Sequence, residues 1–230
     1  MNSDFLDDKL QDRFHRNAYR HLQLAEGKHD FFSNDYLGIA RNGLIEAALD
    51  GHAYGHGSTG SRLLAGNYPL IEDTDTLIAD FHESHAALIF NSGYDANLGL
   101  LSCVAQREDT ILYDKLSHAS IRDGIRLSRA QAFSFAHNDL EDLERKLQKK
   151  AGHCFVVTES VFSMDGDTAP LAEISILCDQ YNAGFIVDES HATGIIGEEG
   201  EGLIQQLHLQ ERCFARIHTF GKACVCHGAV

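Results

Sequence analysis

Short apolar segments alternate with amphipathic segments of helical length along most of this chain. Short apolar runs are typical of buried strands, whereas apolar residues three or four positions apart are typical of helices that cover a sheet. Strands are predicted at residues 30–32, 87–90, 110–113, 131–135, 154–158, 185–187 and 214–219. Helices are predicted at residues 4–24, 44–53, 67–84, 92–104, 117–128, 139–150 and 171–181.

The alternation of strands and helices predicts an α/β fold, a mostly parallel sheet with helices on both faces. We expect residues 1–45 to form an N-terminal helical arm and residues 46–230 to form one large domain. The last four residues have the pattern of a strand that has just begun. We therefore expect the chain to be incomplete at its C-terminal end, with a small domain missing.

Composition narrows the possible partners and location. The formal net charge is −15 and no basic cluster offsets it, so neither nucleic acid nor a membrane is an expected partner. The apolar runs are too short to span a bilayer, and the N-terminus lacks a signal-peptide pattern, so a cytoplasmic protein is expected. A Cys-x-Cys-His sequence begins at Cys224, but no second ligand pair follows at a suitable spacing, so no metal site is expected.

One lysine and one aspartate follow the last two predicted strands. Asp188 ends the apolar run at residues 185–187, and Lys222 comes after the run at residues 214–219. Pyridoxal phosphate enzymes use such a pair, in which the lysine forms a Schiff base and the aspartate pairs with the pyridinium nitrogen. A single lysine after a strand is more often a surface charge, so this interpretation depends on the residues around it.

Other predicted strand ends also carry suitable polar groups. Residues 92–94 (Ser-Gly-Tyr) open a helix whose backbone N–H groups can bind a phosphate, although an ordinary N-cap also explains the serine. His118 can stack on an aromatic ring, or it can be a surface histidine. Glu159 and Ser163 follow a further strand, and His191 follows Asp188. Because ligands of α/β sheets bind at the carboxyl ends of strands, the set together predicts one ligand site.

A glycine-rich segment lies between the helices predicted at residues 44–53 and 67–84. Residues 55–60 match the spacing of a dinucleotide-binding fingerprint, but that motif needs a strand before it and a helix that opens within it. A polar, helical segment precedes it here. We therefore interpret the glycines as a flexible loop that approaches a ligand or another subunit.

Five motifs, in order, resemble the α-oxoamine synthase family, a group of fold-type I pyridoxal phosphate transferases of aminotransferase class II. They are residues 34–38 (Asn-Asp-Tyr-Leu-Gly), 116–120 (Leu-Ser-His-Ala-Ser), 161–167 (Val-Phe-Ser-Met-Asp-Gly-Asp), 188–194 (Asp-Glu-Ser-His-Ala-Thr-Gly) and 219–222 (Thr-Phe-Gly-Lys). The similarity extends from about residue 30 to the end of the chain.

The resemblance implies a role for each candidate residue. Lys222 would hold the cofactor and act as the base, Asp188 would pair with the ring nitrogen, and His118 would stack on the ring. The implied further cofactor contacts come from Ser92, Gly93, Tyr94, Ser163, His191 and Thr219. The implied substrate contacts come from Arg20, Asn34 and Glu159. Asn34 and the loop at residues 57–61 would act across a homodimer interface.

The resemblance also implies an activity. Members condense an amino acid with an acyl-CoA or acyl carrier protein thioester, with decarboxylation, to give an α-aminoketone. The motifs, residues 135–139 included, are most similar to members that join L-alanine to a pimeloyl thioester in biotin synthesis. Alternatives are members that use glycine or serine, an aminotransferase or lyase of the same fold, and an inactive chain that serves only as a dimer partner. We also expect this sequence to lack the family's C-terminal domain, which carries an arginine for the substrate carboxylate.

Overall fold

The computed structural model describes residues 4–22, 24, 27–55 and 57–230. The chain divides into two units at the boundary between Ser33 and Asn34. The helices are α1 (Asp4–His15), α2 (Leu44–Leu49), α3 (Pro69–Phe81), α4 (Gly93–Val104), α5 (Ala119–Ser128), α6 (Leu140–Leu147), α7 (Leu171–Gln180) and α8 (Leu203–Gln206), with short 3-10 turns η1 (Ile39–Arg41) and η2 (Gln210–Arg212). The strands are β1 (Thr110–Asp114), β2 (Gln131–Phe135), β3 (Cys154–Glu159), β4 (Ala183–Asp188) and β5 (Cys213–Ile217). The domain boundary expected at residue 45 stays a prediction.

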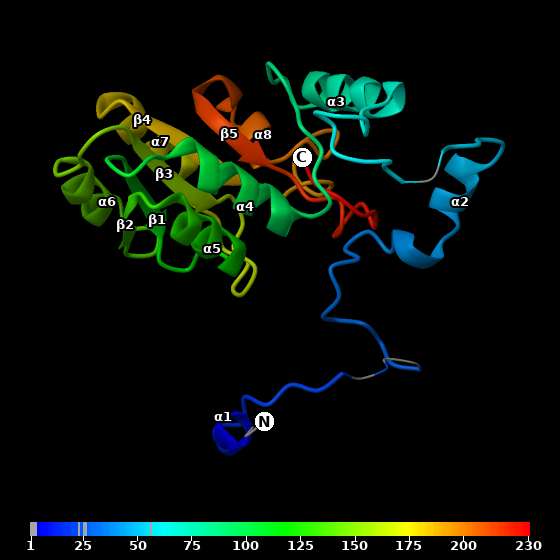
Figure 1. Ribbon diagram of the computed structural model, residues 1–230, viewed down its shortest axis with the longest axis horizontal. Coiled ribbons are helices and arrows are strands. Elements are labelled where there is room, and N and C mark those ends of the chain that lie inside the picture. Colours follow the sequence, from blue (N-terminus) through cyan, green and yellow to red (C-terminus); the bar gives the residue numbers. More distant parts are fainter. Residues whose placement is uncertain (1–3, 23, 25–26, 56) are drawn as a thin grey trace. The chain divides into compact units, whose positions relative to one another are not determined.

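The second unit is built on a five-stranded sheet in the order β2-β1-β3-β4-β5 (Figure 1). Every neighbouring pair of strands is parallel, so the predicted α/β fold is confirmed. The register places Glu159 beside Asp188 at the carboxyl ends of β3 and β4. Two acids that are far apart in the sequence are therefore neighbours.

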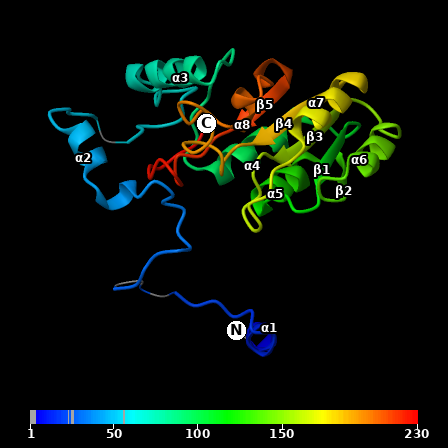
Figure 2. The same ribbon diagram turned by 180° about the vertical axis from the view of Figure 1, so that it is seen from behind.

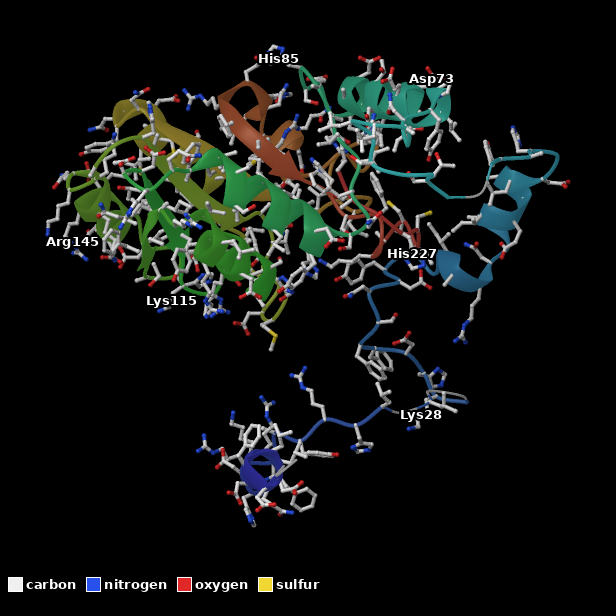
Figure 3. All side chains as sticks on the ribbon, viewed as in Figure 1. Lys28, Asp73, His85, Lys115, Arg145 and His227 are labelled. Carbon is white, nitrogen blue, oxygen red and sulfur yellow. The ribbon has the colours of Figure 1, made fainter. Side chains whose placement is uncertain are left out.

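Alternate residues of each strand enter different cores. Val156 and Phe185 face the core that contains residues of α6 and α7, whereas Val157 and Ile186 face the core that contains residues of α4 and α5. Successive side chains of a strand point to opposite faces, so a strand that is apolar at every position has a helix layer on both sides. Two opposite views show these layers (Figures 1 and 2). Charged side chains such as Arg145 of α6 and Asp73 of α3 remain exposed (Figure 3).

Helices α4 and α5 pack closely because α5 carries a glycine at the contact. A side chain on Gly124 would lie 2.8 Å from the backbone oxygen of Asn97 and 3.0 Å from Leu101. The close approach brings Asn97 to the edge of the sheet, where it contacts residues described below.

Two predicted elements near the N-terminus are shorter or different. The helix predicted to residue 24 ends at His15, because Asn17 adopts a left-handed conformation (φ 53°) and the N–H of Ala18 turns back to the carbonyl of Arg13. The strand predicted at residues 30–32 is a turn. The carboxylate of Asp30 accepts the N–H groups of Phe32 and Ser33, at 3.1 and 2.9 Å, and this bends the chain. None of the described helices is long and apolar enough to cross a membrane.

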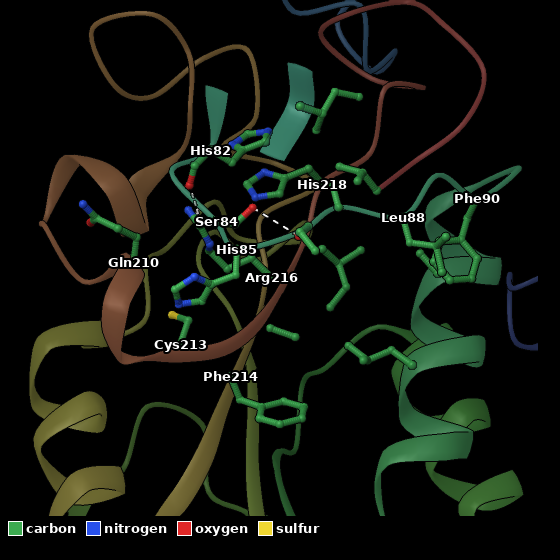
Figure 4. Close-up of a pocket in the computed structure, with 18 of the residues that line it drawn as sticks. His82, Ser84, His85, Leu88, Phe90, Gln210, Cys213, Phe214, Arg216 and His218 are labelled. Carbon is green, nitrogen blue, oxygen red and sulfur yellow. Dashed lines mark hydrogen bonds between the residues drawn. The ribbon is translucent and has the colours of Figure 1, made fainter. Parts of the chain in front are cut away.

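The strand predicted at residues 87–90 is an isolated bridge. Phe90 pairs antiparallel with Ala229, and Ala229 also pairs with Thr219, so the C-terminal residues lie between Phe90 and the segment after β5. Within the described residues, the segment at 87–90 pairs through this single bridge. Next to them, a cavity of about 590 Å³ lies between β5 and residues 86–90, lined mainly by apolar groups such as Leu88 and Phe214 (Figure 4).

Two buried histidines stack at one end of this cavity. The rings of His82 and His218 have centroids 3.7 Å apart and planes 21° apart, and both side chains are almost fully buried (Figure 4). Nδ1 of His218 bonds the hydroxyl of Thr193 at 2.9 Å. Burial, together with the nearby charge of Arg216, lowers the pKa of His82 to about 4, and burial lowers the pKa of His218 well below its ordinary value.

The stacked pair is expected to make the fold sensitive to acid. A histidine whose pKa is lower when folded takes up a proton on unfolding, so the stability present at pH 7 is lost as the pH falls from about 6.5 towards 4. For His82 alone the loss between pH 7 and pH 5 is about 2 kcal/mol. Urea unfolding of the parent and of His82→Phe at both pH values measures it. The variant should lose less stability than the parent, and the exposed control His85→Phe should behave as the parent does. Equal losses in all three would contradict the expectation.

Candidate active site

The carboxyl ends of β3, β4 and β5 surround one lysine. Glu159 and Asp188 are the last residues of β3 and β4 and are buried, and the turn after β5 carries Lys222, which is half-buried. Burial lowers the pKa of Lys222, although the charges of Asp188 and Glu159 act in the opposite direction. A larger share of this amine is therefore neutral, and hence nucleophilic and basic, than of an exposed lysine.

Asp188 is held by two donors. The side-chain N–H₂ of Asn97 in α4 donates to Oδ2 at 2.7 Å, and the backbone N–H of Ser190 donates to Oδ1 at 2.9 Å. Asn97 is itself buried and also donates to the hydroxyl of Ser120 at 3.2 Å. The sequence did not single out Asn97, because an asparagine within a helix gives no sign of the strand that it will contact.

His118 joins the same network from the other side. It is the N-cap of α5, its Nδ1 lies 2.8 Å from the hydroxyl of Ser120, and its backbone N–H donates to Oε1 of Glu159 at 2.6 Å. Hydrogen bonds thus connect His118 to Asp188 through Ser120 and Asn97. The imidazole is exposed, so one of its faces is free to meet a bound ring.

Two more titratable groups of the site have shifted pKa values. Burial, reinforced by the charge of Asp188, raises the pKa of Glu159 to about 8, so this side chain carries a proton at neutral pH. Burial and the charge of Lys222 lower the pKa of His191 to about 4, which keeps its imidazole neutral. Groups with such shifts gather at functional sites because catalysis needs proton donors and acceptors in defined states.

The N-terminus of α4 forms a cradle for an anion. Ser92 is the N-cap and accepts the N–H of Asp95 at 3.1 Å, which leaves the backbone N–H groups of Gly93 and Tyr94 at the start of the helix. A side chain on Gly93 would lie 3.3 Å from Thr219 and 3.7 Å from the hydroxyl of Ser190, so the glycine keeps this space open. The phenol of Tyr94 points elsewhere and donates to Asp123. Backbone donors, two hydroxyls and a helix N-terminus suit a phosphate.

A tyrosine connects the segment after residue 33 to the site. The Tyr36 hydroxyl lies 2.8 Å from Nδ1 of His191 and 3.1 Å from Oδ1 of Asn34. The structure therefore brings Asn34 towards His191, 157 positions later in the sequence. Tyr36 belongs to the motif at residues 34–38, which marked this segment as part of the site. The sequence did not predict the contact between Tyr36 and His191.

The remaining predicted residues lie outside this cluster. Ser163 lies on a loop after β3; its side chain is exposed and makes no hydrogen bond within the described part of the chain. Arg20 is exposed in the first unit, and its role stays a prediction. In the glycine loop, no helix begins among the described residues; the next one begins at Pro69.

Comparison with known proteins agrees with this arrangement. The family described as aminotransferase class I and II matches residues 26–229. The chain belongs to the aminotransferase class I and II family. A putative 8-amino-7-oxononanoate synthase of Microcystis aeruginosa is 40% identical, over 95% of this chain and 61% of that protein. An 8-amino-7-oxononanoate synthase of Emericella nidulans is 42% identical, over 87% of this chain and 54% of that protein.

Solved structures give the same fold. A serine palmitoyltransferase of S. paucimobilis with bound PLP-myriocin aldimine superposes with a TM-score of 0.85 at 28% identity, over 99% of this chain and 62% of that one. The 8-amino-7-oxononanoate synthase of Francisella tularensis has a TM-score of 0.71 at 31% identity, over 87% of this chain and 56% of that one. This member of the aminotransferase class I and II family spans about half to three-fifths of the length of the curated relatives it matches. The expected fold-type I similarity to α-oxoamine synthases is confirmed.

Proposed function

We propose that the protein is a pyridoxal phosphate-dependent C-acyltransferase that condenses L-alanine with a pimeloyl thioester, with decarboxylation, to give 8-amino-7-oxononanoate. The observation that carries the proposal is the cluster of Lys222, Asp188, Glu159 and His191 at one edge of the sheet, next to an anion cradle. The two curated relatives described above, both named 8-amino-7-oxononanoate synthase, support the choice of substrates.

The donors of the site fit the proposed cofactor. The cradle of Gly93, Tyr94 and Thr219 would hold the phosphate, with the hydroxyl of Ser190 as a further donor. Asp188 would bind the ring nitrogen, His118 would cover one ring face, and His191 and Ser163 would donate hydrogen bonds near the hydroxyl oxygen of the ring. When bound, pyridoxal phosphate supplies an electron sink that stabilises negative charge on the substrate Cα.

The side chains of the chain itself carry the proton transfers. Lys222 is the nucleophile that anchors the cofactor and then the base that removes a proton from the substrate Cα, and its lowered pKa suits both roles. Glu159, which is protonated at neutral pH, holds the backbone of His118 in place. Neutral His191 can accept or donate a hydrogen bond without adding a charge beside Lys222. Asn34 and Arg20 are the proposed substrate contacts.

A second copy of the chain is the proposed partner. Leu49 of α2, Leu63 and Leu64 after the glycine loop, and Leu77 of α3 are exposed by half or more. So many large apolar side chains in water within one stretch are typical of an interface. A homodimer would cover them and would bring the glycine loop to the partner's site.

A related activity has support of its own. The structural similarity to serine palmitoyltransferase reaches a TM-score of 0.85, so a serine-using or glycine-using condensation is the second candidate. The two candidates share the cofactor site and differ in the amino acid and the acyl chain.

The test has two stages. Pyridoxal phosphate is added to the purified protein, the adduct is reduced with borohydride, and the labelled peptide is mapped; we expect the label on Lys222. Release of CoA from pimeloyl-CoA is then compared with L-alanine, glycine and L-serine, and the fastest release is expected with alanine. Release with palmitoyl-CoA and serine alone would favour the second candidate. Absence of any label would refute the enzymatic proposal and leave the inactive dimer partner.

A further inference from the structure

The loop that carries Ser163 is closed on itself and attached to the fold at few points. Within it, the N–H of Phe162 bonds the carbonyl of Asp167, and the N–H of Gly166 bonds the carbonyl of Phe162, both at 2.9 Å. The tip, residues 163–166, is exposed. The start of the loop is attached through the N–H of Ser160, which bonds the carbonyl of Asp188 at 2.9 Å, and its end through the carbonyl of Thr168, which accepts the amide of Asn138 at 3.2 Å. Between these ends, Phe162 enters the core and Asp167 bonds side chains outside the loop.

His137, in the turn after β2, contacts both of these attachment residues. Its Nε2 lies 2.7 Å from Oδ2 of Asp167, and its ring edge meets the ring of Phe162 with centroids 4.5 Å apart. Its Nδ1 lies 3.0 and 3.1 Å from the two carboxylate oxygens of Asp114, the last residue of β1. The imidazole therefore bridges the loop to the sheet.

Both nitrogens of His137 face carboxylates, and Nε2 also lies 3.3 Å from the side-chain amide of Asn138. A carboxylate only accepts hydrogen bonds, and a neutral imidazole has a single N–H, so both contacts can be hydrogen bonds only if the ring is doubly protonated. Burial lowers the pKa of His137, but the bonds to Asp114 and Asp167 more than offset this and the net shift is upward. Asp114 and Asp167 are the charged groups that act on the ring within the described residues; the adjacent amide of Asn138 also donates to Asp167, at 2.9 Å.

Asp114 also shapes the turn that leads to His118. It is fully buried and accepts the N–H groups of Leu116 at 2.8 Å and of Asn138 at 3.0 Å. The carboxylate of Asp114 thus holds the turn that leads to His118 and, through His137, also holds the loop that carries Ser163.

We propose that His137 is a positioning residue that holds the loop at residues 160–168, and with it Ser163, against the end of β1 through the carboxylates of Asp114 and Asp167. The role of Ser163 rests on the proposed function, whereas the bridge itself does not. The bridge needs a charged imidazole, so it weakens as the pH rises through the raised pKa of His137.

Hydrogen exchange of the loop tests the proposal without substrate or cofactor. In His137→Gln one amide replaces two charged bonds, so the protection of residues 160–168 should fall by about tenfold or more while that of β4 stays unchanged. Between pH 6 and pH 9 the protection factor of the loop should fall in the parent and stay level in the variant. NMR of the parent should show His137 titrating above 6.5. His153→Gln, which changes an exposed histidine, is the matched control.

Two outcomes would overturn the proposal: unchanged loop protection in His137→Gln, or titration of His137 at or below the ordinary histidine value. If His137→Gln does not fold, Asp167→Asn is a second variant, because it removes the charge on the loop side of the bridge at a partly exposed position. Asp167→Asn should lower the protection of residues 160–168 as well. Unchanged protection in this variant would equally contradict the bridge. Pyridoxal phosphate titration separates the two proposals. A loosened loop with unchanged cofactor affinity would support the bridge and refute the cofactor role of Ser163.

Discussion

Replacing Lys222 with alanine is expected to remove all borohydride-fixed pyridoxal label from the protein and to lower CoA release by at least about 10³-fold. The amine is the proposed anchor and the proposed base, and Lys222 is the half-buried cation next to Asp188 and Glu159. Among the described residues, no other lysine lies beside Asp188 and Glu159 to take over either step. Mass mapping of the reduced peptide and a CoA-release assay measure the two effects.

Two further variants separate chemistry from folding. Lys222→Arg keeps the positive charge beside Asp188 but cannot supply a neutral amine, so it should fail as completely as the alanine variant. Lys115→Ala removes an exposed lysine from the turn after β1 and should keep both label and activity (Figure 3). Full labelling of either Lys222 variant at another lysine, with activity retained, would show that the anchor has been assigned wrongly.

Replacing Asp188 with asparagine is expected to leave the label on Lys222 but to lower CoA release by about 10²–10³-fold, the usual effect of losing one preorganised electrostatic partner. The side chain keeps its shape and loses its charge. Its new amide must also compete with the donors Asn97 and Ser190, since only one oxygen remains to accept from both. We therefore expect a loss of stability of about 1–2 kcal/mol as well.

The same variant has a measurable effect on a neighbour. The charge of Asp188 is one cause of the raised pKa of Glu159, after burial, so the pKa of Glu159 should fall in Asp188→Asn. Infrared titration of the carboxyl band follows this change. Asp73→Asn, on the exposed side of α3, is the control and should alter neither activity nor the band (Figure 3). Activity close to that of the parent would refute the pairing of Asp188 with the cofactor.

The pattern of apolar residues determined the elements of the sheet and the residues at its carboxyl edge. Strands β3 and β4 each carry consecutive apolar residues, at 154–157 and 185–187, because both of their faces are covered, and such runs can be recognised without a structure. In a parallel sheet the residue after each run must lie at one edge. Glu159, Asp188 and Lys222 were therefore predictable as residues of the same edge, whereas the strand order of the structure made Glu159 and Asp188 neighbours.

The tertiary structure alone decided which partners these residues have. Asn97 and Asp188 are 91 positions apart, and His137 meets Asp167 across 30 positions, so each contact depends on strand order and on how closely helices pack. The same holds for the stacked rings of His82 and His218. Periodicity reports which side of an element is buried. It carries no information on which distant element covers that side, because burial by any apolar neighbour satisfies the same pattern.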